Sequence, residues 1–232
     1  MGFLVPLLMC AIFLSIWISL CRFFLAIYTV SMKRALFRSL SLDKKSAEAL
    51  ISLYFGAKSL FRRRWFPKRS SIGTVYEEIP CILLIGRKVF VLELCQYPGI
   101  IHNTREASWR INPPEEYRKK EVFVQNPVCL ARDRAAILKD LFHALKKLPF
   151  EVSVEFMAVL ADKRCTLTNG AEDGLYTLPE AIARLWEYSP KNKLSQKRMK
   201  RERAVISSIL EYYSLSRLRA VARNDRIRRQ KK

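Results

Sequence analysis

The sequence predicts an α/β domain with a mixed sheet, preceded by one transmembrane helix. Residues 2–20 contain no charged side chain. Beyond residue 44, the spacing of apolar residues alternates between the periods of helices and of strands. About 200 residues follow the apolar segment, which is enough for one domain with a sizeable core.

The apolar N-terminal segment is long enough to cross a bilayer. A helix that rises about 1.5 Å per residue needs roughly 20 apolar residues to do so, and residues 23–32 extend the run beyond Arg22. A cleaved signal peptide is the competing interpretation, but no basic residue precedes the run and no small-x-small site precedes Lys33. We therefore expect an uncleaved anchor over residues 1–32.

The charges around this segment predict its orientation. Five basic residues follow it closely: Lys33, Arg34, Arg38, Lys44 and Lys45. Because positive charge stays on the inner side, we expect a single-pass membrane protein with its body on the cytoplasmic side. The cysteines agree, since Cys10 and Cys21 fall in the span and Cys81, Cys95, Cys129 and Cys165 show no disulfide or CxxC spacing.

Net charge divides the rest of the chain into three parts. Residues 33–69 carry eleven Lys and Arg against two acids, a net +9. Residues 70–188 carry fifteen against sixteen, a net −1, and residues 189–232 carry fifteen against three, a net +12. The basic character therefore belongs to the two flanks of a nearly neutral middle.

The middle of the chain reads as helix, strands, helix, strand, helix. A helix is expected over residues 44–60 with Asp43 as its N-cap, closed by the basic residues of 62–69. The further expected elements are strands at 80–85 and 89–95 about a turn at Gly86, a third strand from Ile100, a polar loop at 112–121, a helix at 131–146, a strand at 151–160, a loop at 168–174 and a helix at 178–188 capped by Thr177. Beyond Pro190 we expect a basic helix or a partly ordered tail that contributes few core residues.

Four motifs follow one another in this middle part of the chain. They are the hairpin ILLIGRKVFVLE (82–93), the Tyr97-Pro98-Gly99 break with Trp109 downstream, the Asn126-Pro127 step, and the helix that follows it. In these motifs the chain resembles the nuclease-related domain (NERD) family, a branch of the restriction-endonuclease-like PD-(D/E)xK nucleases. The resemblance covers roughly residues 44–188 and implies an α/β fold with a restriction-endonuclease-like mixed sheet flanked by helices. The expected organisation is an anchor at 1–32, a basic juxtamembrane segment at 33–43, a NERD-like domain at 44–188 and a basic C-terminal tail at 189–232.

The resemblance also indicates where an active site would lie. In that family the first hairpin strand presents Asp and the second presents Glu-x-Lys; the carboxylates hold a divalent cation that activates water, and Lys orients the water or neutralises charge. The alignment retains Glu93 but places Cys81 at the Asp position and Cys95 at the Lys position. Glu48 is the candidate for the family's helical Glu, and Leu130 stands at a Gln position.

These substitutions predict that the inherited mechanism is lost. A thiol is a poor ligand for Mg²⁺ and carries no fixed positive charge. We assign no catalytic residue and treat Glu48, Cys81, Glu93 and Cys95 as vestigial positions, with Glu93 as the candidate metal ligand. Glu93 reads equally well as a structural carboxylate with a buried partner.

Other residues of these motifs have plain interpretations that we prefer. Cys81 and Cys95 could meet across the hairpin as a zinc or redox pair, but buried inert thiols are the better expectation. His102 and His143 are expected to be ordinary surface or core side chains. Trp109 is expected to pack in the core rather than stack on a base.

The basic flanks admit three interpretations: a solvated surface, attraction to an anionic leaflet, or nucleic-acid binding. Attraction to a leaflet is favoured for residues 33–69. In the C-terminal flank, the candidates for binding nucleic acid or anionic lipid are Lys197, Arg198, Lys200, Arg201, Arg203, Arg226, Arg228 and Arg229.

We therefore expect a membrane-anchored, catalytically inactive binding or scaffolding module for nucleic acid or another polyanion. Its expected partners are the bilayer and, beyond it, nucleic acid or anionic headgroups, and no cofactor is expected. The alternative is an active, Mg²⁺-dependent nuclease whose catalytic groups have migrated to Lys88, Glu77 or Glu78. A purely structural membrane-surface protein is a third class.

Overall fold

A computed structural model describes residues 17, 18, 20, 43–70, 73–114, 121–145, 148–162, 164–169, 173–189 and 193–214. The chain divides into two compact units, Met1–Leu40 and Ser41–Lys232. In the first unit, Trp17, Ile18 and Leu20 are helical and exposed; the rest of the expected span lies outside the described residues. Within the part of the chain that is described, no helix combines the length and apolar character needed to cross a membrane.

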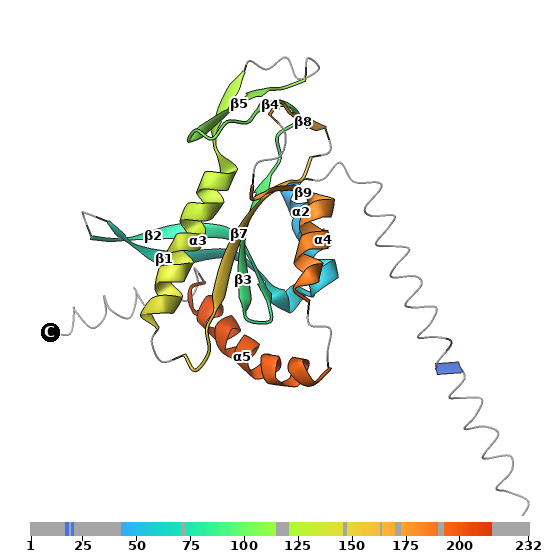
Figure 1. Cartoon of the computed structure of the whole chain (residues 1–232), viewed down its shortest axis with the longest axis vertical. Coiled ribbons are helices and arrows are strands. Elements are labelled where there is room, and N and C mark those ends of the chain that lie inside the picture. The colour runs from blue at the N-terminus through green and yellow to red at the C-terminus, as the bar shows by residue number, and fades with distance from the viewer. Residues whose placement is uncertain are drawn as a thin grey trace, which may run out of the picture. The chain divides into compact units, whose positions relative to one another are not determined.

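The second unit is an α/β body with two mixed sheets (Figure 1). The helices are α2 (Lys44–Phe55), the short 3-10 helix η1 (Ala57–Ser59), α3 (Pro127–Ala144), α4 (Leu178–Glu187) and α5 (Lys193–Tyr212). The strands are β1 (Leu60–Ser70), β2 (Gly73–Ile85), β3 (Lys88–Cys95), β4 (Gly99–His102), β5 (Ser108–Asn112), β6 (Val122–Gln125), β7 (Ser153–Leu160), β8 (Cys165–Leu167) and β9 (Leu175–Thr177).

The larger sheet has the order β1-β2-β3-β7-β9. Its first three strands are antiparallel, and β7 then pairs parallel with both β3 and β9. A parallel neighbour requires a crossover connection, which α3 supplies between β3 and β7. The register sets Cys81 opposite Leu92, and Leu92 opposite Met157.

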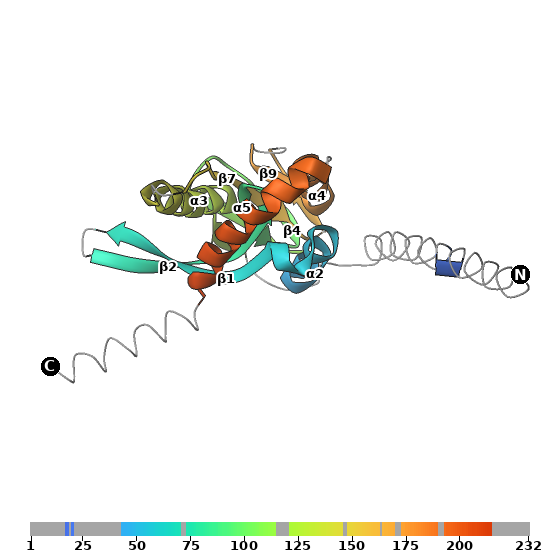
Figure 2. The ribbon, with the colours of Figure 1, turned by 90° about the horizontal axis from the view of Figure 1, so that it is seen from below.

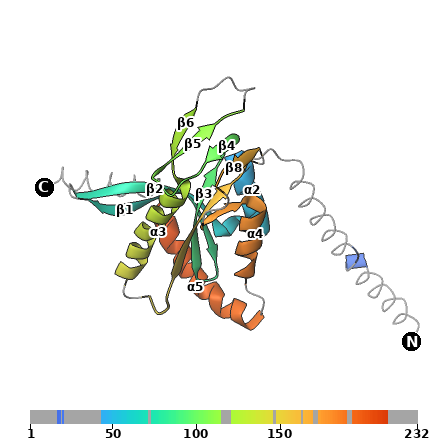
Figure 3. The same cartoon turned by 45° about the horizontal axis from the view of Figure 1, so that its top comes forward.

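The smaller sheet, of order β6-β5-β4-β8, lies at one end of the body (Figure 3). Its core is formed around Trp109, which is fully buried and donates its indole N–H to the carbonyl of Thr104 at 2.9 Å. The expectation that Trp109 is a packing residue is confirmed. The sheet contains the expected third strand at Ile100, together with β5, β6 and β8, which we did not predict.

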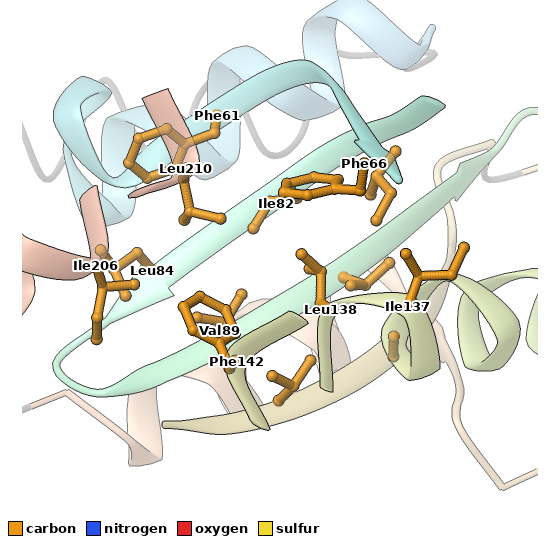
Figure 4. Close-up of a cluster of buried hydrophobic side chains, with 14 residues drawn as sticks. Phe61, Phe66, Ile82, Leu84, Val89, Ile137, Leu138, Phe142, Ile206 and Leu210 are labelled. Carbon is orange, nitrogen blue, oxygen red and sulfur yellow. The ribbon is translucent and has the colours of Figure 1, made fainter. Parts of the chain in front are cut away.

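Helices cover both faces of the larger sheet. One hydrophobic cluster joins β1, β2 and β3 to Leu138 of α3 and to Ile206 and Leu210 of α5 (Figure 4). Successive strand residues point to opposite faces, and Phe90 of β3, outside this cluster, contacts the ring of Tyr188 just beyond α4. Helix α4 therefore lies over the other face, together with α2, whose Tyr54 contacts Trp186 of α4.

Local sequence explains the ends of the predicted elements. Asp43 caps α2 through Ser46 N at 2.8 Å, and Asn126 caps α3 in the same way. Thr177 and Glu180 form the capping box of α4. The helices at 44–60, 131–146 and 178–188 and the strands at 89–95 and 151–160 are confirmed within a few residues, except that α2 ends at Phe55. The strand expected at 80–85 is confirmed but is longer, because β2 begins at Gly73.

Residues 60–70 correct the expectation that the basic residues of 62–69 close the helix predicted over residues 44–60. Helix α2 stops because Gly56 has a φ of +88°, a conformation that favours glycine. The basic residues that follow belong to strand β1, which pairs with β2 along its length. They do not form a loop or a helix end, and Figure 2 shows β1 and β2 extending together away from the body.

The structure also corrects the expectation that the C-terminal flank contributes few core residues. Ile206 and Leu210 of α5 are fully buried in the main core, and Arg87 of the hairpin turn binds Glu202 with two hydrogen bonds of 2.5 and 2.6 Å. The backbone N–H of Trp65 donates to Tyr213 O at 3.0 Å. Residues 193–214 are therefore part of the folded body, because the amphipathic stretch inside the basic flank completes the core.

Candidate functional site

The site begins at Glu93, on the central strand β3. Its side chain is only 10% exposed, and burial raises its pKa, an effect that Arg134 and then Lys44 oppose. Arg134, on α3, forms an ion pair with Glu93 through Nη1. The prediction that Glu93 is a carboxylate with a buried partner is confirmed, and the partner is a guanidinium.

The same guanidinium approaches a second carboxylate on the neighbouring strand. Arg134 Nε lies 3.8 Å from Glu77 Oε1, and Lys68 Nζ lies 3.0 Å from Glu77 Oε2. Glu77 of β2 and Glu93 of β3 thus flank Arg134, whose side chain is only 15% exposed. Two carboxylates on adjacent strands could hold a hard divalent metal ion between them. Here the positive charge between them is instead the guanidinium of Arg134.

The two cysteines lie on different faces of the sheet. Glu93 and Cys95 are two residues apart on β3 and share a face, as expected. Cys81 is paired with Leu92, so its side chain points to the opposite face. Cys81 therefore does not converge with Glu93 and Cys95, and the zinc or redox pair of Cys81 and Cys95 that we weighed has no support in the register.

Both thiols are buried, which raises the pKa of each well above its usual range. Burial also raises the pKa of Tyr97 to about 12, with smaller contributions from Cys95 and Glu93. Tyr97 and Cys95 are consequently both protonated near neutral pH. Neither of these two neighbours of Glu93 can serve there as a general base.

Glu48 belongs with Cys81 rather than with Glu93. Its carboxylate binds Arg62 Nε at 2.6 Å, and Arg62 is the residue paired with Cys81 across β1 and β2. Both Glu48 and Arg62 influence the pKa of Cys81. The carboxylate of Glu48, the candidate for the family's helical Glu, is therefore already paired with a cation on the face of the sheet that α2 covers.

Of the three substitutes that we considered, one reaches the site. Lys88 binds Glu155 at 2.6 Å and lies 4.0 Å from the centre of the Tyr188 ring, at the far end of the hairpin. Glu78 binds Arg63 at 2.7 Å. Of these three residues only Glu77 is linked to Glu93, because both carboxylates contact the side chain of Arg134. Among the described residues, no group of three or more His, Cys, Asp and Glu side chains could hold a metal ion.

The basic candidates of the C-terminal flank are only partly described. Lys200 and Arg201 are exposed on α5, and Arg203 is half-buried. Lys197 and Arg198 lie in α5 without a described side chain, and Arg226, Arg228 and Arg229 lie outside the described residues. Leu130 is half-buried at the start of α3, His143 is exposed, and the ring of His102 lies 3.2 Å from the Asn112 amide.

Sequence reasoning missed Arg134, although one signal was present. Arg134 falls between Ala131, Ala135 and Leu138, which occupy the buried stripe of α3. A charged residue on the apolar face of a helix requires a buried partner. That partner lies 41 residues away along the chain, and helix periodicity alone cannot identify it.

Comparisons of the chain with protein-family models, with curated proteins and with solved structures found no match in any of the three. What the chain does is therefore inferred from its own residues and their geometry.

Proposed function

We propose that this protein is a membrane-anchored, catalytically inactive relative of the nuclease-related domains that binds nucleic acid or another polyanion on the cytoplasmic side of a membrane. The mixed sheet flanked by helices agrees with the restriction-endonuclease-like fold that the sequence motifs imply. The exposed apolar side chains of Trp17, Ile18 and Leu20 agree with a membrane anchor.

One observation carries the loss of catalysis: Arg134 lies between Glu77 and Glu93. A nuclease of this class needs carboxylates that are open to a divalent cation. Here the guanidinium supplies the positive charge: it donates a hydrogen bond to Glu93 and lies within ion-pair distance of Glu77. A metal ion would have to displace a buried, permanently charged side chain, which is unfavourable because like charges repel.

The test is cleavage by the full-length chain, purified in detergent, of single- and double-stranded DNA and RNA with Mg²⁺ or Mn²⁺. We expect the wild type to match a Glu93→Gln variant at background level. Metal-dependent cleavage that disappears in Glu93→Gln would show an active enzyme and overturn this part of the proposal.

The alternative, an active nuclease with migrated groups, is favoured by Glu77, which brings a second carboxylate to Glu93. If Arg134 only masks a functional site, Arg134→Ala should create Mn²⁺-dependent cleavage that a second change, Glu77→Gln, removes. We expect no such gain. Lys139→Ala, an exposed change on the same helix, is the matched control.

Binding of a polyanion is supported by the basic C-terminal flank. The net +12 of residues 189–232 produces a strong local potential, and each phosphate it neutralises releases counterions. We expect the affinity for nucleic acid or anionic vesicles to fall steeply with salt. A chain ending at Ser214 keeps α5 but lacks eight Lys and Arg, and should show a shallower dependence of log K on log salt; an unchanged slope would exclude the terminal segment.

A further inference from the structure

A pocket of about 240 Å³ lies between the ends of α2 and α4, the β2–β3 turn and helix α5. It is far along β3 from Glu93, at the opposite end of the strand. Two cations line it, Lys200 and Arg203, and no carboxylate is among its lining residues. Glu202, next to Arg203 in sequence, instead binds Arg87. The pocket therefore favours an anionic ligand.

Arg203 is held in place by a buried serine. Its Nη2 donates to Ser59 Oγ at 2.5 Å, and Ser59 is 2% exposed. The Ser59 hydroxyl in turn donates to Phe55 O at 2.5 Å, so its lone pairs remain for the guanidinium. This hydrogen bond fixes a planar group with several further N–H donors at the pocket, the geometry that suits a phosphate.

Three aromatic residues also line the pocket: Tyr54, Phe55 and Trp186. The Trp186 ring contacts Tyr54 edge-on at 6.3 Å and Phe55 at 5.9 Å between ring centres. Even so, Trp186 remains 52% exposed. Neighbouring rings hold the indole in one orientation while leaving much of its surface open to a planar ligand.

We propose that this pocket binds a nucleotide, with the base against Trp186 and the phosphate at Lys200 and Arg203. A purely apolar ligand would strip water from two cations without pairing them. Inorganic phosphate would leave Trp186 uncovered. Base stacking on an aromatic ring beside a basic group is the combination that single-stranded nucleic-acid sites use. The inference rests on the proposed binding of polyanions and names its ligand unit, which is either a free mononucleotide or one unit of a strand.

The experiment uses the full-length chain in detergent and four probes: AMP, ribose 5-phosphate, a six-nucleotide single-stranded oligonucleotide, and anionic vesicles. We expect Trp186→Leu to weaken AMP or the oligonucleotide by roughly tenfold while leaving ribose 5-phosphate unchanged. Lys200→Gln should weaken all three phosphate probes. Lys139→Gln, an exposed charge on α3 outside the pocket, and Phe123→Leu, an exposed ring elsewhere, are the matched controls.

The outcomes separate this inference from the proposed function. Loss with AMP identifies a mononucleotide site, and loss with the oligonucleotide alone identifies a unit of a strand; both support the pocket. If binding of both AMP and the oligonucleotide persists unchanged in Trp186→Leu, the pocket assignment is wrong, although salt-dependent binding of the oligonucleotide would still support polyanion binding. If AMP binds through Trp186 but neither the oligonucleotide nor vesicles bind, the pocket stands and the proposed function fails. An effect of Trp186→Leu confined to vesicles would overturn the nucleotide assignment in favour of a lipid.

Discussion

Arg134 is the residue on which the neighbourhood of Glu93 depends. Burial already raises the pKa of Glu93, and the guanidinium opposes that shift. Arg134 favours the ionised form of Glu93, and removing this partner would leave an ionised Glu93 as a buried, unpaired charge, which is strongly destabilising.

Replacing Arg134 with Gln should therefore destabilise the body by about 3 kcal/mol at neutral pH. Because the pKa of Glu93 is higher in the folded than in the unfolded protein, its contribution to the free energy of unfolding is fully present below the unfolded-state pKa. That contribution is lost as the pH rises through the folded-state pKa. Since Arg134→Gln raises that folded value further, the deficit should be small near pH 4 to 5 and largest near pH 8. Thermal unfolding of wild type and variant across this range measures it.

The double variant Arg134→Gln, Glu93→Gln is the control, because it removes both charges. It should recover much of the lost stability and show no added dependence on pH. A pH-independent loss in the single variant, unchanged in the double, would mean that Arg134 acts by packing and not by pairing.

The thiols give a second expectation at this scale. Because burial raises the pKa of Cys81 and Cys95, both are protonated and shielded, and a protonated thiol does not alkylate. Iodoacetamide at pH 8 should modify Cys129 and Cys165, which are partly exposed, well before it reaches the buried pair. Peptide mass spectrometry after a timed pulse distinguishes them, and rapid labelling of Cys95 would contradict its assigned burial.

At the scale of elements, α5 is the least expected contributor to stability. Its residue Ile206 is fully buried, and Ile→Ala at such a site costs about 3 kcal/mol. We expect Ile206→Ala to lower the unfolding temperature clearly. The neighbouring Val205→Ala, at an exposed position, should change stability by less than about 0.5 kcal/mol.

Truncated chains test the same contribution of α5 to stability. A chain ending at Ser214 should unfold as cooperatively as the full chain, whereas one ending at Pro190 should lose cooperative unfolding because the face of β1 and β2 beneath α5 becomes exposed. Equal unfolding temperatures for the two truncations would mean that α5 only rests on the sheet.

Strand β1 shows why sequence patterns identified some elements and not others. The β2–β3 hairpin was recognisable because its strands are continuously apolar and meet at a Gly-containing turn. In β1 the buried residues Phe61 and Phe66 are five apart, which breaks the period of two. Arg63, with a φ of +50°, lies between them and resets the alternation.

The charges of β1 concealed it further. Its exposed cations bind carboxylates that come from other elements, such as Glu48 of α2 and Glu78 of β2. A run of Arg and Lys therefore read as a surface cluster, although Arg62, Arg63 and Lys68 each pair with a carboxylate of another element. Local periodicity predicts elements; pairings between distant elements, including that of Arg134 and Glu93, require the fold itself.

For the whole molecule, the expectation that remains to be tested is topology. The basic residues after position 33 and the uncharged segment before it favour a body on the cytoplasmic side. Protease added outside intact cells or right-side-out vesicles should leave the body uncut, and permeabilised membranes, as the control, should expose it. Digestion from the outside of intact membranes would reverse the orientation.

The packing of α5 has a consequence for how the protein is made. The main core begins at Phe61 and is completed by Ile206 and Leu210, so its earliest and latest members are separated by most of the chain. Until the final helix has been synthesised, the sheet surface beneath it stays open to solvent, and such surfaces aggregate readily. If the first residues anchor the chain in a membrane, as proposed, the nascent chain would be held there with this surface exposed until α5 closes the core.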